Sequence, residues 1–320
     1  MAPVLQVNNL QVTYYTEGGR VRALDGVNLE LDPGEKLGLV GESGSGKSTM
    51  ALAMMRMIRS PGRIEGGRVV VNGIDITGLG ENAMREARLS LISYIPQGAM
   101  NSINPVMRIG AQMKDAMQAH AAKFSAAQIQ ARIDEALTSV DLKPSVARMY
   151  AHELSGGMKQ RVCIAIGILL KPKLIIADEP TSALDVVTQR QVMQTLDNVQ
   201  GLLGSAIILI GHDMGLMAQF VDKVAVMYTG RLMELSPVAE MFAKPLHPYA
   251  QALIQSLPDL KKRGVFNGIP GLAPALLRLP SGCSFHPRCP IAQDSCKQIV
   301  PAFEEKLANR FVACHFVDKA

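Results

Sequence analysis

The chain has 320 residues, too many for one small core, and its length suits one large domain or two. A composition of 48% hydrophobic and 19% charged residues with a net charge of +5 is typical of a globular protein. Aromatic residues make up 4% and Trp is absent, which argues against a stacking platform for nucleic-acid bases, so we expect no nucleic-acid partner. The apolar runs are shorter than the roughly 20 residues of a membrane span, and we expect no signal peptide.

The elements alternate along the chain between strand-like and helix-like patterns. Residues 5–15 and 27–41 alternate or run apolar, and residues 66–78 form a strand–turn–strand pattern around Asn72-Gly73. Residues from about 104 to 151 show helical spacing, with Ser125 as the N-cap of the second helix. Strand patterns return at three places, residues 173–180, 205–213 and 223–235. This alternation predicts an α/β fold with a largely parallel, doubly wound sheet and a helical insertion.

The segment "GESGSGKST", Gly41 to Thr49, fits the phosphate-binding pattern G-x-x-x-x-G-K-[ST] and follows an apolar run. Its glycines let successive backbone N–H groups turn toward phosphate oxygens, and the next helix adds its positive dipole end. Lys47 is placed to reach the outer phosphates and Ser48 to bind Mg²⁺. A bland glycine-rich turn is the alternative, but the strand before and the helix after favour nucleotide binding.

The segment "KLIIADEP" supplies acidic side chains at the end of a predicted buried strand, Leu174 to Ala177. Ligands of open α/β sheets bind at the carboxyl ends of strands. Asp178 is therefore placed to hold Mg²⁺ and Glu179 to polarise the water that attacks the γ-phosphate.

Further motifs narrow the class of protein. "ELSGGMKQR" contains Leu154 to Gly157, "SYIPQ" ends at Gln97, "SALD" ends at Asp185, and "LIGHD" contains His212. With these motifs in the family's order along the sequence, the chain resembles the ATP-binding subunits of ABC transporters over roughly residues 5 to 245. The resemblance implies a P-loop NTPase (RecA-like) core with an N-terminal antiparallel β subdomain, a helical signature subdomain at about residues 98–165, and a small C-terminal extension.

The resemblance also implies roles for single residues. Glu179, His212, Lys47 and Gln97 would act in catalysis, and Ser48, Gln97 and Asp178 would hold Mg²⁺. Two chains would sandwich each ATP. The residues expected to contact ATP are Tyr14 (favoured over Tyr15 for stacking on adenine), Gly41, Ser43, Gly44, Ser45, Gly46, Lys47, Ser48, Thr49 and Gln97, with Ser155, Gly156, Gly157 and Asp185 acting in trans from the second chain. Met158 stands where the family most often has Gln.

The tail identifies a branch of this family. "HPYAQALIQSLPDL" and "IPGLAPALLRLPSGCSFHPRCP" resemble the C-terminal extension of dipeptide and oligopeptide importer ATPases, which divides the chain into residues 1–245 and 246–320. The implied partners are two transmembrane permease subunits, a second ABC ATPase in a heterodimer and an extracytoplasmic substrate-binding protein. The implied location is the cytoplasmic face of the inner membrane, as a peripheral protein. Alternatives are a nickel or glutathione importer of the same branch and a soluble ABC ATPase without a transport role.

Four of the five cysteines gather in this tail, at Cys283, Cys289, Cys296 and Cys314, with spacing C-x5-C-x6-C-x17-C. Zinc sites favour closer pairs, and a disulfide is disfavoured in the reducing compartment expected for this chain. Four thiolates suit a [4Fe–4S] cluster, although the spacing is not a ferredoxin pattern. The resemblance to dipeptide-importer ATPases also favours the cluster. A zinc site and a tail without any metal remain as alternatives. Cys163 is interpreted as a small core residue.

Overall fold

A computed structural model describes residues 2–98, 102–120, 124–182, 184–256 and 268–317. The chain divides into two compact units: Met1–Gln6, Glu30–Glu35 and Val69–Ile208 form the first, and Val7–Leu29, Lys36–Arg68 and Leu209–Ala320 form the second. The chain crosses between them five times. Four crossings fall within the strands β1 (Leu5–Thr16), β2 (Gly19–Leu31), β4 (Gly62–Val71) and β8 (Ala206–Ile210), and the fifth lies between Glu35 and Lys36.

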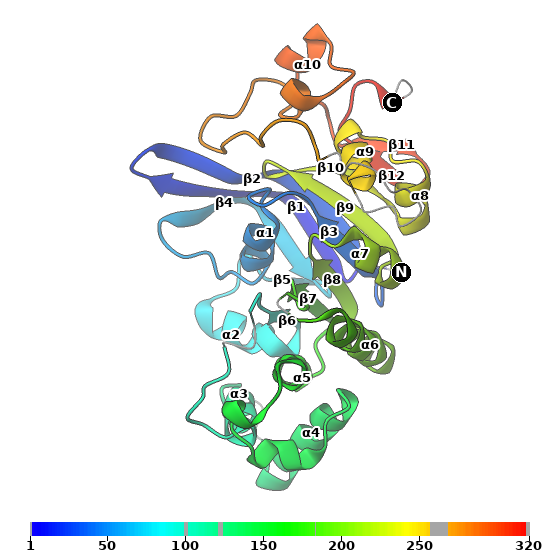
Figure 1. Cartoon of the computed structure of the whole chain (residues 1–320). Helices are drawn as coiled ribbons and strands as arrows, with labels where there is room; N and C mark the ends of the chain where they lie inside the picture. Colours follow the sequence, from blue (N-terminus) through cyan, green and yellow to red (C-terminus); the bar gives the residue numbers. More distant parts are fainter. Residues whose placement is uncertain (1, 99–101, 121–123, 183, 257–267, 318–320) are drawn as a thin grey trace. The chain divides into compact units, whose positions relative to one another are not determined.

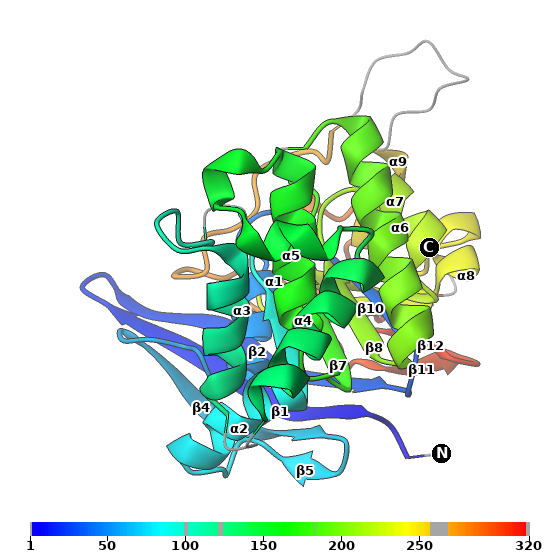
Figure 2. The same cartoon turned by 90° about the horizontal axis from the view of Figure 1, so that it is seen from below.

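The first unit combines short strands with the five longest α-helices among the described residues (Figures 1 and 2). Its other elements are β5 (Ile74–Asp75), α2 (Glu81–Ser90), β6 (Ile92–Ile95), α3 (Ile109–Gln118), α4 (Ala126–Ser139), the 3-10 helices η2 (Pro144–Arg148) and η3 (Ala151–Glu153), α5 (Gly156–Ile168), β7 (Leu174–Asp178) and α6 (Val186–Leu203). Strands β6 and β7 pair in parallel, with Ile92 opposite Leu174. All five residues of β7 are buried, which explains its continuous apolar run.

The predicted helical insertion is confirmed as α3 and α4, which pack on each other, and both contact α5. Ser125 caps α4 with a reciprocal capping box, because its hydroxyl accepts from the Gln128 N–H and the Gln128 side chain accepts from the Ser125 N–H. Helix α4 buries one face, which includes Ile129 and Ile133. Part of the first predicted helix, residues 121–123, lies outside the described residues.

The second unit pairs parallel and antiparallel strands. Its remaining elements are β3 (Lys36–Val40), α1 (Lys47–Met54), α7 (Met214–Phe220), β9 (Lys223–Tyr228), β10 (Arg231–Pro237), α8 (Val238–Ala243), α9 (Pro248–Gln255), the 3-10 helix η4 (His286–Arg288), α10 (Asp294–Gln298), β11 (Glu304–Leu307) and β12 (Arg310–Val312). Strand β3 pairs in parallel with β9, but β9 and β10 form an antiparallel hairpin. The strand pattern predicted at residues 223–235 is therefore confirmed as two strands joined by a turn. The chain reverses at Thr229 and Gly230, both of which have positive φ.

The tail extends this sheet, which the sequence pattern does not predict. Strand β12 pairs antiparallel with β10, with Glu234 opposite Val312, and β11 pairs with β12. Glu234 is fully buried, forms an ion pair with Arg310 at 3.2 Å and accepts hydrogen bonds from the Leu246 and His247 N–H groups. A buried charge is tolerated only with such partners, so this pair fixes the beginning of the tail to its end.

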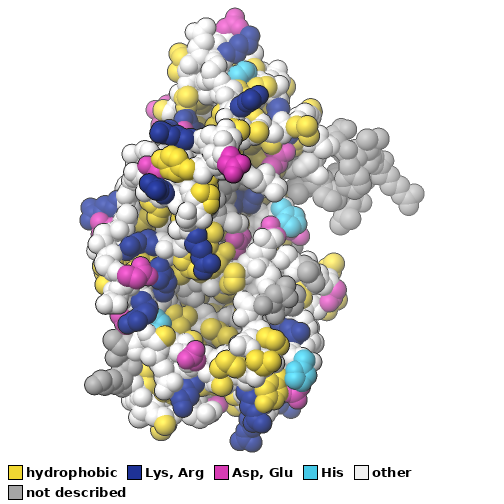
Figure 3. Space-filling model, turned by 90° about the vertical axis from the view of Figure 1, so that its left-hand side faces the viewer, with side chains coloured by type: hydrophobic (Ala, Val, Ile, Leu, Met, Phe, Trp, Pro, Cys, Tyr) yellow, Lys and Arg dark blue, Asp and Glu magenta, His cyan; other side chains and the backbone are white. Residues whose placement is uncertain are grey.

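The surface carries both signs of charge. On the face drawn in Figure 3, Lys and Arg side chains are interspersed with acidic, apolar and uncharged ones. Among the described residues no helix is long and apolar enough to cross a membrane.

His247 gives the fold a predicted dependence on pH. Its ring is buried and caps α9, because Nδ1 accepts from the Tyr249 N–H at 2.9 Å. Burial lowers the pKa of His247 from 6.5 to about 3. The unfolded chain therefore takes up a proton that the folded chain excludes as the pH falls below 6.5. We expect this residue to lower the free energy of unfolding by about 1.4 kcal/mol between pH 7.5 and 5.5.

Urea unfolding at both pH values checks this expectation, with His247→Asn as the comparison, since Asn also caps helices but does not titrate. The variant should lose less stability than the wild type when the pH falls. An equal loss in both proteins would contradict the assignment, whatever the absolute stability of the variant.

Candidate functional site

The phosphate-binding pattern forms a tight loop between β3 and α1 in the second unit. Gly41 has φ 148°, and a Cβ there would overlap the carbonyl oxygen of Met227 at the end of β9. Gly46 has φ 107°, and a Cβ there would lie 2.7 Å from the carbonyl oxygen of Ala23. Both positions therefore require glycine for conformation and for space.

Lys47 begins α1, and its ammonium group is folded onto the loop. Nζ donates to the carbonyl oxygens of Gly41 at 2.8 Å and Glu42 at 2.9 Å, and to the Ser45 hydroxyl at 3.3 Å. The charge therefore lies within the curve of the loop, where a point cation can meet phosphate oxygens. Of the other predicted loop residues, Ser43, Gly44 and Ser48 are exposed, and Thr49 is half-buried.

Two more predicted residues belong to the second unit. His212 is exposed after β8, and the N–H of the preceding Gly211 donates to the carbonyl oxygen of Leu39, in the strand that leads to the loop. Tyr14 is half-buried, and its ring fills the space that a side chain at position 62 would need. Tyr15 is engaged elsewhere, with its hydroxyl donating to Glu65 at 2.8 Å.

The acidic pair lies in the first unit, at the end of β7. Asp178 is 1% exposed and accepts from the Tyr94 hydroxyl at 3.0 Å. Burial, followed by the charge of Asp178, raises the pKa of Tyr94, so the phenol stays a donor. This hydrogen bond fixes the orientation of the Asp178 carboxylate.

Glu179 adopts the left-handed backbone conformation, with φ 45°. This conformation costs a residue with a side chain on the order of 1–3 kcal/mol and is concentrated at functional sites. The Ser182 N–H and hydroxyl both donate to the Glu179 carbonyl oxygen, which holds the bend. The structure brings Gln97 to this carboxylate, with Nε2 donating to Oε2 at 2.6 Å. Two residues predicted from separate motifs thus meet in one unit.

The residues expected to act in trans also lie in the first unit. Ser155 is the exposed N-cap of α5, and Gly156 and Gly157 form its first turn. A Cβ at Gly157 would meet the Thr188 side chain at 2.6 Å. Asp185 caps α6 by accepting from the Val187 and Thr188 N–H groups, and its hydrogen bonds, chiefly with the Thr188 side chain, lower its pKa.

The sequence patterns did not predict the residues that contact Glu42 in the phosphate loop. Glu42 forms a bidentate ion pair with Arg288 of the tail, and its N–H donates to the Tyr249 hydroxyl at 2.9 Å. Arg288 stands in "HPRCP" beside a cysteine, but nothing in the sequence pairs it with a residue 246 positions away.

The four tail cysteines are free thiols in the structure. The Cys283 N–H donates to the Cys296 carbonyl oxygen at 2.8 Å. Burial is the main reason that the pKa of Cys283 is raised to about 11. The charges of the other three tail thiols also raise this pKa, whereas a hydrogen bond with the Phe285 backbone lowers it. Thiolate chemistry suits an iron–sulfur cluster, yet among the described residues no three Cys, His, Asp or Glu side chains have an arrangement that could hold a metal. His286 and His315 bond backbone carbonyl groups, and Cys163 is buried in α5 as predicted.

Comparison with known proteins identifies the family. The family described as "ABC transporter" matches residues 24–182, and "Oligopeptide/dipeptide transporter, C-terminal region" matches residues 233–296. The oligopeptide transport ATP-binding protein OppD of Salmonella typhimurium is 44% identical over 97% of this chain and 93% of its own length. The dipeptide transport ATP-binding protein DppD of Caldanaerobacter subterraneus is 39% identical over 100% of this chain and 98% of its own length.

Solved structures support the same fold. The dimeric ATP-binding cassette MJ0796 in a post-hydrolysis state with ADP and Pi has a TM-score of 0.64 and 26% identity, and covers 73% of this chain and 98% of its own. CbiO1 of Clostridium perfringens has the same TM-score and is 27% identical in sequence. The match covers 76% of this chain and 92% of CbiO1. The predicted α/β P-loop NTPase fold is confirmed. The chain therefore belongs to the ATP-binding subunits of ABC transporters, in the oligopeptide/dipeptide importer family.

Proposed function

We propose that this ATPase subunit energises the uptake of dipeptides or oligopeptides by ATP-driven closure of a nucleotide-sandwich dimer. The contact between Gln97 and Glu179 is the observation that best supports the mechanism, because it joins a residue of the predicted helical insertion boundary to the predicted catalytic carboxylate. ATP hydrolysis would then reset the dimer. The near full-length similarity to peptide transport proteins supports the class of substrate.

The proposed chemistry uses the residues that the sequence motifs single out. Lys47 and the loop from Gly41 to Thr49 would bind the phosphates, and Tyr14 would stack on adenine. Glu179 would orient and deprotonate the attacking water, and His212 would contact the γ-phosphate. The oxygen donors of Ser48, Gln97 and Asp178 fit Mg²⁺, which would neutralise charge on the phosphates when bound.

The second half of each ATP site would come from a partner subunit. Ser155, Gly156 and Gly157 form an exposed helix N-terminus of thirteen-residue α5, a geometry suited to an anion. Asp185 would act beside them across the dimer. The MJ0796 cassette is dimeric in its solved structure, which supports this arrangement by analogy. We propose a heterodimer with a second ABC ATPase.

The remaining partners follow from the same family membership. We propose two transmembrane permease subunits, an extracytoplasmic substrate-binding protein, and a peripheral position on the cytoplasmic face of the inner membrane, with residues 1–245 as the nucleotide-binding domain and 246–320 as the extension. ATPase activity stimulated by the permease subunits would support this assembly. Activity that ignores them would favour a soluble ABC ATPase instead.

Glu179→Gln tests the catalytic assignment. We expect ATP binding to be retained and hydrolysis to fall by at least about a hundredfold, because the amide cannot accept the proton of the attacking water. The ATP-bound dimer should accumulate. ATPase assays and nucleotide titrations measure the two effects.

Glu135→Gln is the matched control, since Glu135 is a half-exposed residue of α4 that pairs with Lys171. It should hydrolyse ATP at the wild-type rate. Wild-type turnover in the Glu179 variant would remove Glu179 from the mechanism.

We further propose that Cys283, Cys289, Cys296 and Cys314 hold a [4Fe–4S] cluster. Their clustering in the tail sequence and the chemistry of an all-thiolate donor set support this proposal. Because no three such side chains among the described residues are arranged to hold a metal, the cluster requires these side chains to rearrange. Zinc is the alternative occupant.

Anaerobic purification with iron and acid-labile sulfide assays tests the cluster. We expect about four iron and four sulfide per chain, and a loss of both in Cys296→Ser. Cys163→Ala should keep them, because Cys163 lies in α5 rather than in the tail. Stoichiometric zinc without sulfide, or no metal at all, would refute the cluster.

A further inference from the structure

The tail holds one residue of the phosphate loop, Glu42, at two points. The guanidinium of Arg288 donates from Nη1 to Oε2 at 2.7 Å and from Nη2 to Oε1 at 3.0 Å. The Glu42 N–H donates to the hydroxyl of Tyr249, which is fully buried in α9. Both the side chain and the backbone of Glu42 are therefore fixed by residues beyond position 245.

The Arg288 side chain is buried and held by several hydrogen bonds. Its side chain is 5% exposed, its Nε donates to the Pro270 carbonyl oxygen at 2.8 Å, and its Nη1 also donates to the Tyr228 hydroxyl at 3.2 Å. The guanidinium carbon lies 5.9 Å from the ring centroids of both Tyr228 and Phe285. Planar, bidentate and ring-stacked contacts of this kind are specific to arginine.

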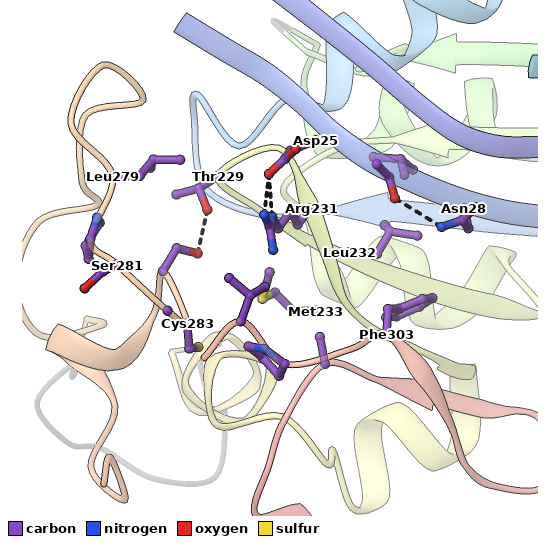
Figure 4. Close-up of a pocket in the computed structure, with 18 residues that line it drawn as sticks. Asp25, Asn28, Thr229, Arg231, Leu232, Met233, Leu279, Ser281, Cys283 and Phe303 are labelled. Carbon is purple, nitrogen blue, oxygen red and sulfur yellow. Dashed lines mark hydrogen bonds and ion pairs between the residues drawn. The ribbon is translucent and has the colours of Figure 1, made fainter. Parts of the chain in front are cut away.

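The tail meets the phosphate loop over more than one contact. Residues 273–277 and the loop residues 42–45 line one cavity of about 390 Å³. An adjoining pocket of about 370 Å³ lies where the tail meets the β9–β10 turn, and there Thr229 donates to Ser284 at 2.6 Å (Figure 4). Arg288 is thus one of several places where the tail lies beside the phosphate loop or the β9–β10 turn.

Glu42 connects this interface to the cation of the loop. Its carbonyl oxygen, with that of Gly41, accepts from the Lys47 ammonium. Its carboxylate is 29% exposed and belongs to a loop whose proposed ligand carries several negative charges. Without a counter-ion this carboxylate would repel a polyphosphate across a short distance.

We propose that Arg288 is a positioning residue for nucleotide binding, which neutralises and fixes Glu42 so that the phosphate loop can accept a nucleoside polyphosphate. The inference rests on the proposed function of the loop, and it makes the C-terminal extension part of the nucleotide site. It assigns a role to the extension that does not require any metal at the cysteines.

The test is Arg288→Gln in the full-length chain, with Mg²⁺ and a non-hydrolysable ATP analogue as the titrant. We expect the dissociation constant to rise about tenfold, because a charge-assisted bidentate pair is lost and the Glu42 carboxylate is left unpaired. The KM for ATP should rise in parallel, with kcat little changed, since the residues proposed for the chemical step are not altered.

Arg288→Gln combined with Glu42→Gln separates charge compensation from simple loss of structure. The double variant should recover most of the affinity, because it removes the repelling charge together with its counter-ion. Lys297→Gln is the control, because it breaks an exposed ion pair with Asp294 on the same tail and should bind like the wild type.

Two results would overturn the inference: wild-type affinity in Arg288→Gln, or a loss of affinity that Glu42→Gln does not reverse. If the wild-type chain itself fails to bind the analogue, the proposed function of the loop fails instead, which keeps the two hypotheses distinguishable.

Discussion

The approach of the Met227 carbonyl oxygen to Gly41 is the constraint on which the phosphate loop depends. A Cβ at position 41 would overlap this oxygen, so the chain can leave β3 in this direction only without a side chain. The same contact ties the loop to β9, the strand that pairs with β3. The conformation of the loop is therefore set by the sheet beneath it, and Lys47 folds onto the carbonyl oxygens that the bend exposes.

The carboxylates of Asp178, Glu179 and Glu42 have different partners. Asp178 is buried and keeps its orientation through the Tyr94 hydroxyl, while Glu179 accepts from Gln97 and sits in a costly backbone conformation. Glu42 instead meets a buried guanidinium from the tail. Glu179 thus meets a neutral amide and Glu42 a guanidinium cation, which is consistent with the catalytic role proposed for Glu179 and the structural role proposed for Glu42.

Sequence patterns predicted elements well where local chemistry decides them. The N-cap at Ser125, the buried run of β7 and the Asn72-Gly73 turn, with φ 47° and 80°, all depend on near neighbours and were predicted. The break between β9 and β10 was missed, because only Thr229 and Gly230 separate the two strand patterns. The pairing of β12 with β10 was missed because it joins residues far apart along the chain.

The sequence alone determined the residue types of the site, since a phosphate loop and the acidic end of a strand need particular side chains at fixed spacing. It also placed the cysteines together in the tail. Only the tertiary structure decided what surrounds these residues. It brings Gln97 into hydrogen-bond contact with Glu179, and it brings Arg288 and Tyr249 into contact with Glu42. Such contacts bridge distant segments, and their geometry depends on how the sheet and the tail pack, which no local pattern encodes.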